Sequence, residues 1–250
     1  MSRHTIAVFL LWAALTVIGE AAVAVSDLFP LAAAEEAAIV DGAFRVLTVM
    51  AVPVMAFVIA MLAYSILRFR VRGEPSQDGP PIRSNGRVLA AWFVVTTGLT
   101  ALMIIYPGII GMNELMDRAR EEPDMVVKVE AMRFAWRFTY PEQNVTVFSK
   151  AEGLVLPVDK HVRFDVTSRD VLHSFWVPAF RMKIDAVPGM VTTIHATPDK
   201  IGTFEDDTQL RLQCTELCGV GHSIMTVPVR VVEQSEFDAW VAQQTQRARR

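Results

Sequence analysis

Twelve residues near the C-terminus of this 250-residue chain bring together side chains that bind soft metals. The run from 214 to 225 reads Cys-Thr-Glu-Leu-Cys-Gly-Val-Gly-His-Ser-Ile-Met and supplies two thiols, an imidazole and a thioether. Thiolate and thioether sulfur prefer soft metals, and imidazole suits copper or zinc. Gly219 and Gly221 allow the chain to fold back. The side chains that can then converge on one point are those of Cys214, Cys218, His222 and Met225.

A further strong ligand has to come from elsewhere in the chain, and His173 is the best candidate. It lies in the run Asp170-Val-Leu-His-Ser-Phe-Trp-Val-Pro178, where a polar residue with an apolar flank indicates a buried imidazole. The other histidines have no sulfur-bearing neighbours in sequence, so each is expected to be a surface or strand histidine: His4, His161 and His195.

Two other interpretations of the cysteines remain open at this point. A disulfide between Cys214 and Cys218 suits an exported domain, but it would close only a small loop and would leave His222 and Met225 unexplained. A zinc site with two cysteines and two histidines matches the donor count. Zinc has little use for a thioether, however, and structural zinc sites usually place their ligands in two separated pairs.

Three long apolar segments precede the motif, and they contain most of the excess that makes 52% of the residues hydrophobic. They run from about Thr5 to Val25, Ala43 to Leu67 and Val88 to Met112. Each has roughly the 20 apolar residues that cross a bilayer as a helix. The second and third hold no acidic or basic residue after Arg45 and Arg87, respectively, so residues 42–112 are expected to form a transmembrane hairpin.

Residues 1–25 allow two interpretations. Arg3, an apolar stretch and then Ala22-Val23-Ala24 fit a signal peptide with a small-residue cleavage site. The apolar run is long for a signal peptide and contains Glu20, which favours a retained transmembrane helix with Glu20 near its outer end.

The charges of the loops predict the orientation of the chain. Arginine dominates the loop between the second and third segments, with Arg68, Arg70, Arg72, Arg83 and Arg87 against only Glu74 and Asp78. Positively charged loops stay on the cytoplasmic side. The loop before the second segment is acidic, with Asp27, Glu35, Glu36 and Asp41, and is expected outside. The third helix then places everything after Asn113 on the outer face.

After Pro123 the pattern changes to short β-type runs separated by turn residues, which predicts an antiparallel sandwich or barrel over residues 113–250. Residues 235–247 place Phe237, Trp240 and Val241 at helical spacing, so a C-terminal helix is expected on the barrel. A net charge of −3 and the lack of a basic, aromatic-interleaved cluster exclude a nucleic-acid-binding protein. The predicted strands cover residues 125–130, 134–140, 161–166, 191–195, 210–213 and 227–232.

The run Cys-x-Glu-x-Cys-Gly-x-x-His-x-x-Met, preceded by Val171-Leu-His-Ser-Phe175, resembles the dinuclear copper motif of cytochrome c oxidase subunit II. The resemblance extends over the helical hairpin, the aromatic run from Phe134 to Tyr140, the segment from Lys183 to Gly189 and the β-domain. It implies an α+β membrane protein in which an N-terminal transmembrane hairpin, or three helices, precedes a cupredoxin-like antiparallel β-barrel.

The resemblance also implies a ligand set, which comprises His173, Cys214, Glu216, Cys218, His222 and Met225. The two thiolates would bridge two copper ions, and each imidazole would bind one of them. The Met225 thioether and the Glu216 backbone carbonyl would be weak ligands, one to each copper. The Glu216 side chain resembles one that reaches a magnesium ion shared with the large subunit.

Two positions depart from the family pattern. Members usually carry a surface tryptophan where cytochrome c hands over its electron, but aligning Trp136 with the later tryptophan of that strand puts Phe134 in this place. Phe134 and Trp136 are therefore the candidate positions at which electrons enter, while simple core packing is expected for at least half of the aromatic residues of this run. The glutamate that often begins the third helix is Leu89 here, so its proton-feeding role is not transferred.

The function that the resemblance implies is the electron-accepting subunit of a terminal respiratory oxidase, a relay that performs no bond chemistry itself. Its partners would be the large haem-bearing subunit, other oxidase subunits and a cytochrome c or similar donor. The donor would be a separate protein, because no Cys-x-x-Cys-His haem motif occurs. The complex would lie in the inner (plasma) membrane, with the copper domain on the external, periplasmic side.

Three other functions are compatible with parts of this pattern. A nitric oxide reductase related to the oxidases would use the same copper chemistry. A copper-free quinol oxidase subunit or a structural zinc domain would be non-redox modules. Quinol oxidase relatives lack the metal ligands, all of which are present here.

Overall fold

The computed structural model describes residues 2–70, 73, 84–148 and 153–249. The chain divides into two compact units, one formed by Met1–Leu28 with Gly42–Met112 and the other by Phe29–Asp41 with Asn113–Arg250. Of the loop that predicts the orientation, Arg72, Glu74, Asp78 and Arg83 lie outside the described residues. The orientation of the chain therefore stays a prediction from the sequence.

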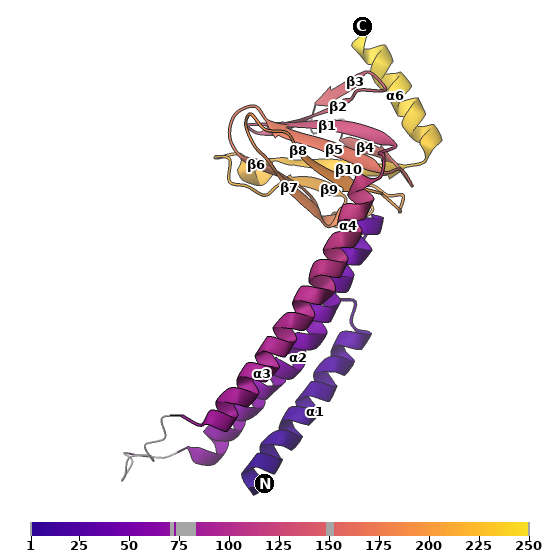
Figure 1. Ribbon diagram of the computed structural model, residues 1–250. Helices are drawn as coiled ribbons and strands as arrows, with labels where there is room; N and C mark the ends of the chain where they lie inside the picture. Colours follow the sequence, from indigo (N-terminus) through magenta and orange to yellow (C-terminus); the bar gives the residue numbers. More distant parts are fainter. Residues whose placement is uncertain (1, 71–72, 74–83, 149–152, 250) are drawn as a thin grey trace. The chain divides into compact units, whose positions relative to one another are not determined.

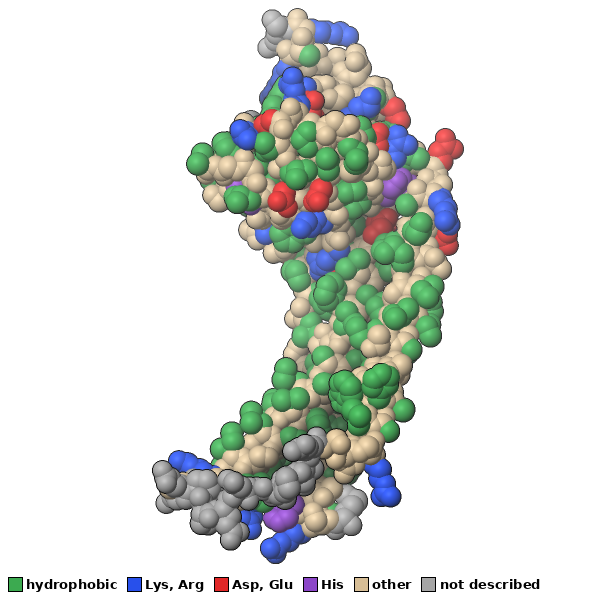
Figure 2. Space-filling view, turned by 60° about the vertical axis from the view of Figure 1, so that its left-hand side comes forward, with side chains coloured by type: hydrophobic (Ala, Val, Ile, Leu, Met, Phe, Trp, Pro, Cys, Tyr) green, Lys and Arg blue, Asp and Glu red, His purple; other side chains and the backbone are tan. Residues whose placement is uncertain are grey.

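The first unit is helical (Figure 1). The helical elements of the N-terminal half are α1 (Arg3–Val25), α2 (Glu35–Phe69), α3 (Gly86–Met103), the π-helix η1 (Ile104–Ile109) and α4 (Ile110–Arg120). In the described part of the chain, three stretches are long and apolar enough to cross a membrane: Arg3–Val25, Glu35–Phe69 and Gly86–Arg120. Their apolar side chains point outward, as Leu10 (61% exposed) and Val94 (72% exposed) show, and green side chains cover the visible face of these helices (Figure 2). Lipid is the solvent that favours such a surface.

Helix α1 packs along α2. The Trp12 indole Nε1 donates a hydrogen bond of 2.8 Å to the carbonyl oxygen of Pro53. Closer to the N-terminus, the His4 ring nitrogen Nδ1 lies 2.8 Å from the Tyr64 hydroxyl. A Cβ atom at Gly19 would come within 2.6 Å of a methyl carbon of Val52, so the absence of a side chain there permits the close approach of the two helices.

The second and third helices extend beyond the apolar segments. Helix α2 begins at Glu35, eight residues before the predicted segment, because acidic residues are favourable in the first turn of a helix. The third helix continues past Met112 to Arg120 and is interrupted at Pro107, where η1 replaces the α-helix and Tyr106 has non-helical angles (φ −139°, ψ 120°). Proline removes a backbone donor, which accounts for a break at this position.

The second unit contains two five-stranded sheets, which confirms the predicted β-domain (Figure 1). One sheet has the order β3-β2-β1-β5-β8, with β3 (Val145–Phe148), β2 (Ala135–Tyr140), β1 (Met125–Met132), β5 (Val162–Ser168) and β8 (Thr192–Ala196). The other has the order β4-β10-β9-β6-β7, with β4 (Leu154–Pro157), β10 (Thr226–Val232), β9 (Arg211–Cys214), β6 (His173–Val177) and β7 (Met182–Ala186). Helix α6 (Gln234–Ala248) follows β10, as expected.

The strand pairing differs from the expectation in one respect. Most neighbouring strands are antiparallel, but β1 pairs with β5, and β4 with β10, in parallel. The strands that the sequence did not predict are β3, β4, β6 and β7. Strand β4 is buried at all four positions and β6 at four of its five, so neither shows the alternation of apolar and polar residues that marks a half-exposed strand.

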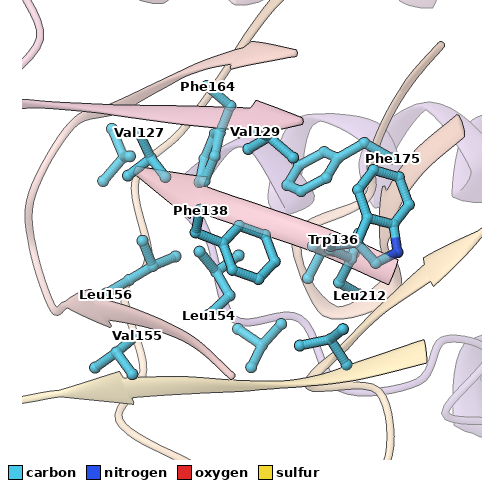
Figure 3. Close-up of a cluster of buried hydrophobic side chains, with 14 of the residues drawn as sticks. Val127, Val129, Trp136, Phe138, Leu154, Val155, Leu156, Phe164, Phe175 and Leu212 are labelled. Atoms are coloured by element: carbon cyan, nitrogen blue, oxygen red, sulfur yellow. The ribbon is translucent and has the colours of Figure 1, made fainter. Parts of the chain in front are cut away.

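The core lies between the two sheets (Figure 3). In β1 and β2 every second side chain is buried, so that Trp136, Phe138 and Tyr140 are fully inaccessible to solvent. The Tyr140 hydroxyl donates to the Val155 carbonyl (3.0 Å) and accepts from the Val155 N–H (3.1 Å). Burial raises the pKa of this phenol, which therefore stays protonated. The expectation of core packing is confirmed for these three aromatic residues.

The segment from Phe29 to Asp41, expected to be an external loop, packs on the β-unit and is helical from Glu35 onward. Its backbone pairs with Ala179 (Ala33 N–H to Ala179 carbonyl, 2.8 Å), and Glu35 N–H donates to the Thr197 carbonyl (3.0 Å). The Arg181 guanidinium forms a bidentate ion pair with Asp41 (2.7 and 3.0 Å) and also donates to the carbonyls of Pro30 and Leu31. Such planar, forked donation fixes geometry as well as charge.

Candidate metal centre

The metal motif forms the loop between β9 and β10. Cys214 ends β9, and its N–H donates to the carbonyl of Met225 (3.1 Å), which closes the base of the loop. His222 begins a short 3-10 helix, η3 (His222–Ile224). Gly219 has a positive φ of 132°, a conformation that favours glycine. The predicted reversal of the chain between Cys218 and His222 is confirmed.

Sheet pairing brings the remote histidine to this loop. His173 is the first residue of β6, and Phe175 of the same strand pairs with Cys214 of β9. The Thr215 N–H donates to the Ser174 carbonyl (3.2 Å), which fixes the register beyond the end of β9. His173 is fully buried, as its apolar flank predicts.

The predicted ligand atoms form a cluster around the two sulfurs, and those of His173, Cys214 and Cys218 all lie within 4.8 Å of one another. Cys214 Sγ is 3.7 Å from His173 Nδ1, and Cys218 Sγ is 3.7 Å from His222 Nδ1. The two Sγ atoms are 4.0 Å apart. Cys218 Sγ lies 3.9 Å from the Met225 sulfur, and Cys214 Sγ lies 3.3 Å from the backbone carbonyl oxygen of Glu216. All six residues that the resemblance implies therefore place a donor atom at the same point of the fold.

These separations fit metal coordination. Two ligands bound tetrahedrally at roughly 2.0 and 2.3 Å are about 3.5 Å apart, close to the nitrogen–sulfur distances found here. A disulfide requires sulfurs about 2.05 Å apart, so the 4.0 Å separation excludes it in this conformation, and both cysteines are free. Thiolate, imidazole and thioether together are donors that suit copper.

Asp170, for which no role was predicted, orients the remote histidine. Its Oδ1 accepts from His173 Nε2 (2.8 Å), so the Nδ1 lone pair is directed toward Cys214. Burial alone would raise the pKa of the Asp170 carboxyl, but hydrogen bonds from His173 and from the Arg133 and Val171 N–H groups outweigh it and lower the pKa to about 2. A polar residue three positions before the ligand was the available sequence signal.

The two residues at which electrons were expected to enter occupy different environments. Phe134 is half-buried, and a Cβ atom at Gly221 would lie 2.4 Å from its ring, so this ring covers the glycines of the metal loop. Trp136 is fully buried, with its ring centroid 6.2 Å from that of His173. Trp136 is thus an internal neighbour of a ligand, and of the two only Phe134 reaches the surface.

Three comparisons place the chain among known proteins. A family model described as cytochrome c oxidase subunit II, periplasmic domain, matches residues 136–232. Heme-copper oxidase subunit 2 of Aeropyrum pernix is 32% identical over 206 residues, which cover 78% of this chain and 85% of the relative. The chain belongs to the heme-copper oxidase subunit II family.

A second relative from the sequence comparison agrees with this assignment. Cytochrome c oxidase subunit 2 of Thermostichus vulcanus is 29% identical over 268 residues, covering 85% of this chain and 77% of the relative. The crystal structure of the periplasmic domain of subunit II from Bradyrhizobium japonicum is 32% identical and covers 51% of this chain and 97% of that one, with a TM-score of 0.47. As a member of the subunit II family, the chain is part of a heme-copper terminal oxidase with an external copper domain, and a nitric oxide reductase is not favoured.

Copper loading of this subunit is expected to weaken as the pH falls. Burial and the neighbouring Cys214 raise the pKa of the Cys218 thiol to about 11, so copper has to displace its proton. Each proton released lowers the apparent association constant about tenfold for every unit of pH decrease. Competition with a Cu(I) chelator at several pH values, combined with measured proton release, checks this. An association constant independent of pH would contradict thiolate ligation.

Proposed function

We propose that this subunit accepts single electrons at a dinuclear copper centre and passes them to the haem centres of the large oxidase subunit. The observation that carries the proposal is a cluster of two thiols with an imidazole nitrogen 3.7 Å from each sulfur. The His173 donor lies within 4.8 Å of both sulfurs, so two metal ions held by these residues would share both thiolates. When bound, the copper pair supplies a one-electron relay.

The protein's own part in this function is to hold the donors and exclude water. His173 is fully buried, and Cys214, Cys218 and Met225 are each at most 4% exposed. Asp170 holds the imidazole of His173 in one orientation. A rigid, dry donor set limits the movement of ligands when the charge of the centre changes, which favours electron transfer over bond chemistry.

The remaining roles follow the family resemblance. Met225 and the Glu216 carbonyl would be weak ligands, and the exposed Glu216 carboxylate is available for a magnesium ion shared with the large subunit. Electrons would arrive from a cytochrome c or a similar donor near Phe134. We further propose that α1 is retained as a third span and that the complex lies in the inner membrane with the copper domain on the periplasmic side.

The proposal is tested on the full chain purified in complex from native membranes. We expect two copper ions per chain and a mixed-valence electron paramagnetic resonance signal with hyperfine structure from both nuclei. One copper ion per chain, or zinc alone, would contradict the assignment of a dinuclear copper centre. Oxygen consumption by the complex, measured against turnover of nitric oxide, checks the terminal acceptor.

Replacing Met225 by leucine is expected to keep both copper ions but to raise the reduction potential. Leucine removes a weak donor from a buried position, and apolar surroundings disfavour the more positively charged oxidised centre. We expect a shift on the order of 60 mV, the change that alters a one-electron equilibrium tenfold. Potentiometry of Met225→Leu is compared with Met190→Leu, which changes an exposed methionine. Equal potentials in the two variants would remove Met225 from the ligand set.

A further inference from the structure

Four side chains of the β-unit form a continuous hydrogen-bonded chain. His195 Nδ1 of β8 lies 3.1 Å from His161 Nε2, and the two rings are stacked with centroids 5.0 Å apart. His161 Nδ1 lies 3.2 Å from the Thr197 hydroxyl. That hydroxyl donates to Glu36 Oε1 (3.1 Å), and the Thr197 N–H donates to Glu36 Oε2 (2.8 Å). The chain therefore joins a histidine pair to a carboxylate in the first turn of α2.

The hydrogen-bonded network of these four side chains is largely enclosed by the protein. Glu36 is 6% exposed and His161 is 8% exposed, whereas His195 is half-buried. Backbone hydrogen bonds hold the two inner members of the network, because His161 N–H donates to Asp124 (2.9 Å) and Glu35 N–H donates to the Thr197 carbonyl (3.0 Å). Groups held in this way keep their hydrogen-bond partners, so the network has a defined geometry.

The chemistry of the four side chains allows hydrogen bonds to be donated in one direction only, from His195 toward Glu36. An ionised carboxylate only accepts, so the Thr197 hydroxyl gives its single proton to Glu36. The hydroxyl oxygen then accepts from His161, which must carry its proton on Nδ1. His161 Nε2 is left as an acceptor, so His195 also carries its proton on Nδ1. The Nε2 of His195 remains a bare nitrogen, and no hydrogen bond to it occurs within the described residues.

His195 and Glu36 both line a cavity of about 250 Å³. Both positively and negatively charged side chains lie around the two histidines. Arg163 is the cross-strand neighbour of His195 and is itself paired with Asp165. The cavity is also lined by Arg118, Arg181 and Lys183, of which the first two pair with Glu35 and Asp41.

We propose that His195, His161, Thr197 and Glu36 form a proton relay that takes up a proton at His195 Nε2 and delivers it to the Glu36 carboxylate. As an N–H bond forms at His195 Nε2, the Nδ1 proton of His195 moves to His161 Nε2. The Nδ1 proton of His161 moves to the Thr197 oxygen, and the hydroxyl proton of Thr197 moves to Glu36. One proton enters, both imidazoles remain neutral with reversed tautomers, and the carboxylate becomes a carboxylic acid.

The groups around His195 favour the form of its ring that can accept a proton. Burial, followed by the charges of His161 and Arg163, lowers the pKa of His195, while Asp165 and Glu36 act in the opposite direction. The lowered pKa favours the neutral form of His195, which has a lone pair to accept a proton. Neutralising Glu36 removes a negative charge from the N-terminal turn of α2, where such a charge is stabilising. Proton uptake is thereby linked to the attachment of the segment Phe29–Asp41 to the sheet.

The tautomers are measured in the full chain in detergent, labelled with nitrogen-15 in its five histidines and with copper reduced to diamagnetic Cu(I). At about pH 8, above the ordinary histidine pKa of roughly 6.5, we expect His161 and His195 to carry their protons on Nδ1. In Thr197→Val, His161 loses its acceptor, so both rings should reverse to the Nε2–H form. Thr193→Val changes an exposed threonine that lines the same cavity and should leave both tautomers unchanged.

Delivery to the carboxylate is followed by infrared difference spectroscopy during acidification. The carbonyl band of a protonated carboxyl should appear over the same pH range as the histidine changes, and Glu36→Gln should remove it. If Thr197→Val does not fold, the Glu36→Gln comparison still tests the relay. Nε2–H tautomers in the unmodified chain would overturn the proposal. Protonation of the histidines while Glu36 stays ionised would also overturn the proposal. The four side chains would then form a hydrogen-bond network that does not transfer a proton.

Discussion

Replacement of Cys218 by serine is expected to abolish the mixed-valence copper signal while the chain still folds. Cys218 Sγ lies within 4.0 Å of the sulfurs of Cys214 and Met225 and of His222 Nδ1, so its loss removes a donor that is close to three others. A serine hydroxyl is a poor ligand for a soft metal and cannot bridge two copper ions as a thiolate does. The fold should survive, because Cys218 lies in a loop and such a substitution costs roughly 0.5–3 kcal/mol.

The measurement combines copper content, electron paramagnetic resonance and circular dichroism of the purified complex. Val220→Ala is the matched control, because Val220 is in the same loop but fully exposed, and it should retain both copper ions. A Cys218→Ser variant with two copper ions and hyperfine structure from both nuclei would show that the thiolate does not bridge. An unfolded variant would show instead that the loop stabilises the β-unit without metal.

Replacement of Arg181 by methionine is expected to destabilise the β-unit by about 3–5 kcal/mol, the typical cost of removing one partner of a buried ion pair. The side chains of Arg181 and Asp41 are only 12% and 17% exposed, so methionine would leave a poorly solvated carboxylate without its counter-charge. The carbonyls of Pro30, Leu31 and Pro178 would also lose a donor. Methionine has a side-chain volume similar to that of arginine. Both residues would be strained alike by the left-handed backbone at this position (φ 55°).

Denaturant unfolding of the full chain in detergent, followed by tryptophan fluorescence, measures the loss. A total stability of roughly 5–15 kcal/mol is usual, so the midpoint should fall markedly. Arg230→Met is the control, because its pair with Glu236 is 34% and 55% exposed and should contribute less than about 1 kcal/mol. Adding Asp41→Leu to Arg181→Met should recover part of the stability. Equal effects of Arg181→Met and Arg230→Met would show that the segment Phe29–Asp41 does not depend on this pair.

Some helices and strands were predictable from the sequence, and others were not. The apolar segments were predictable because a membrane span requires about 20 consecutive apolar residues, a property of composition alone. Strands β1, β2 and β5 were predictable because one face of each is buried, which produces a period of two. Strands β4 and β6 are buried on nearly all sides and lack that period, so local sequence could not distinguish them from other apolar runs.

The donor side chains and their order were predictable from the sequence, because four of these side chains lie within twelve residues and two glycines allow the loop to turn. The contact between His173 and Cys214 was not, since it depends on the register of β6 against β9 and joins residues 41 positions apart. The same holds for the burial of Trp136, the packing of Phe29–Asp41 on the sheet and the stacking of His161 on His195. Each of these contacts joins segments distant in the chain, so its free energy depends on the whole packed unit and leaves no local pattern.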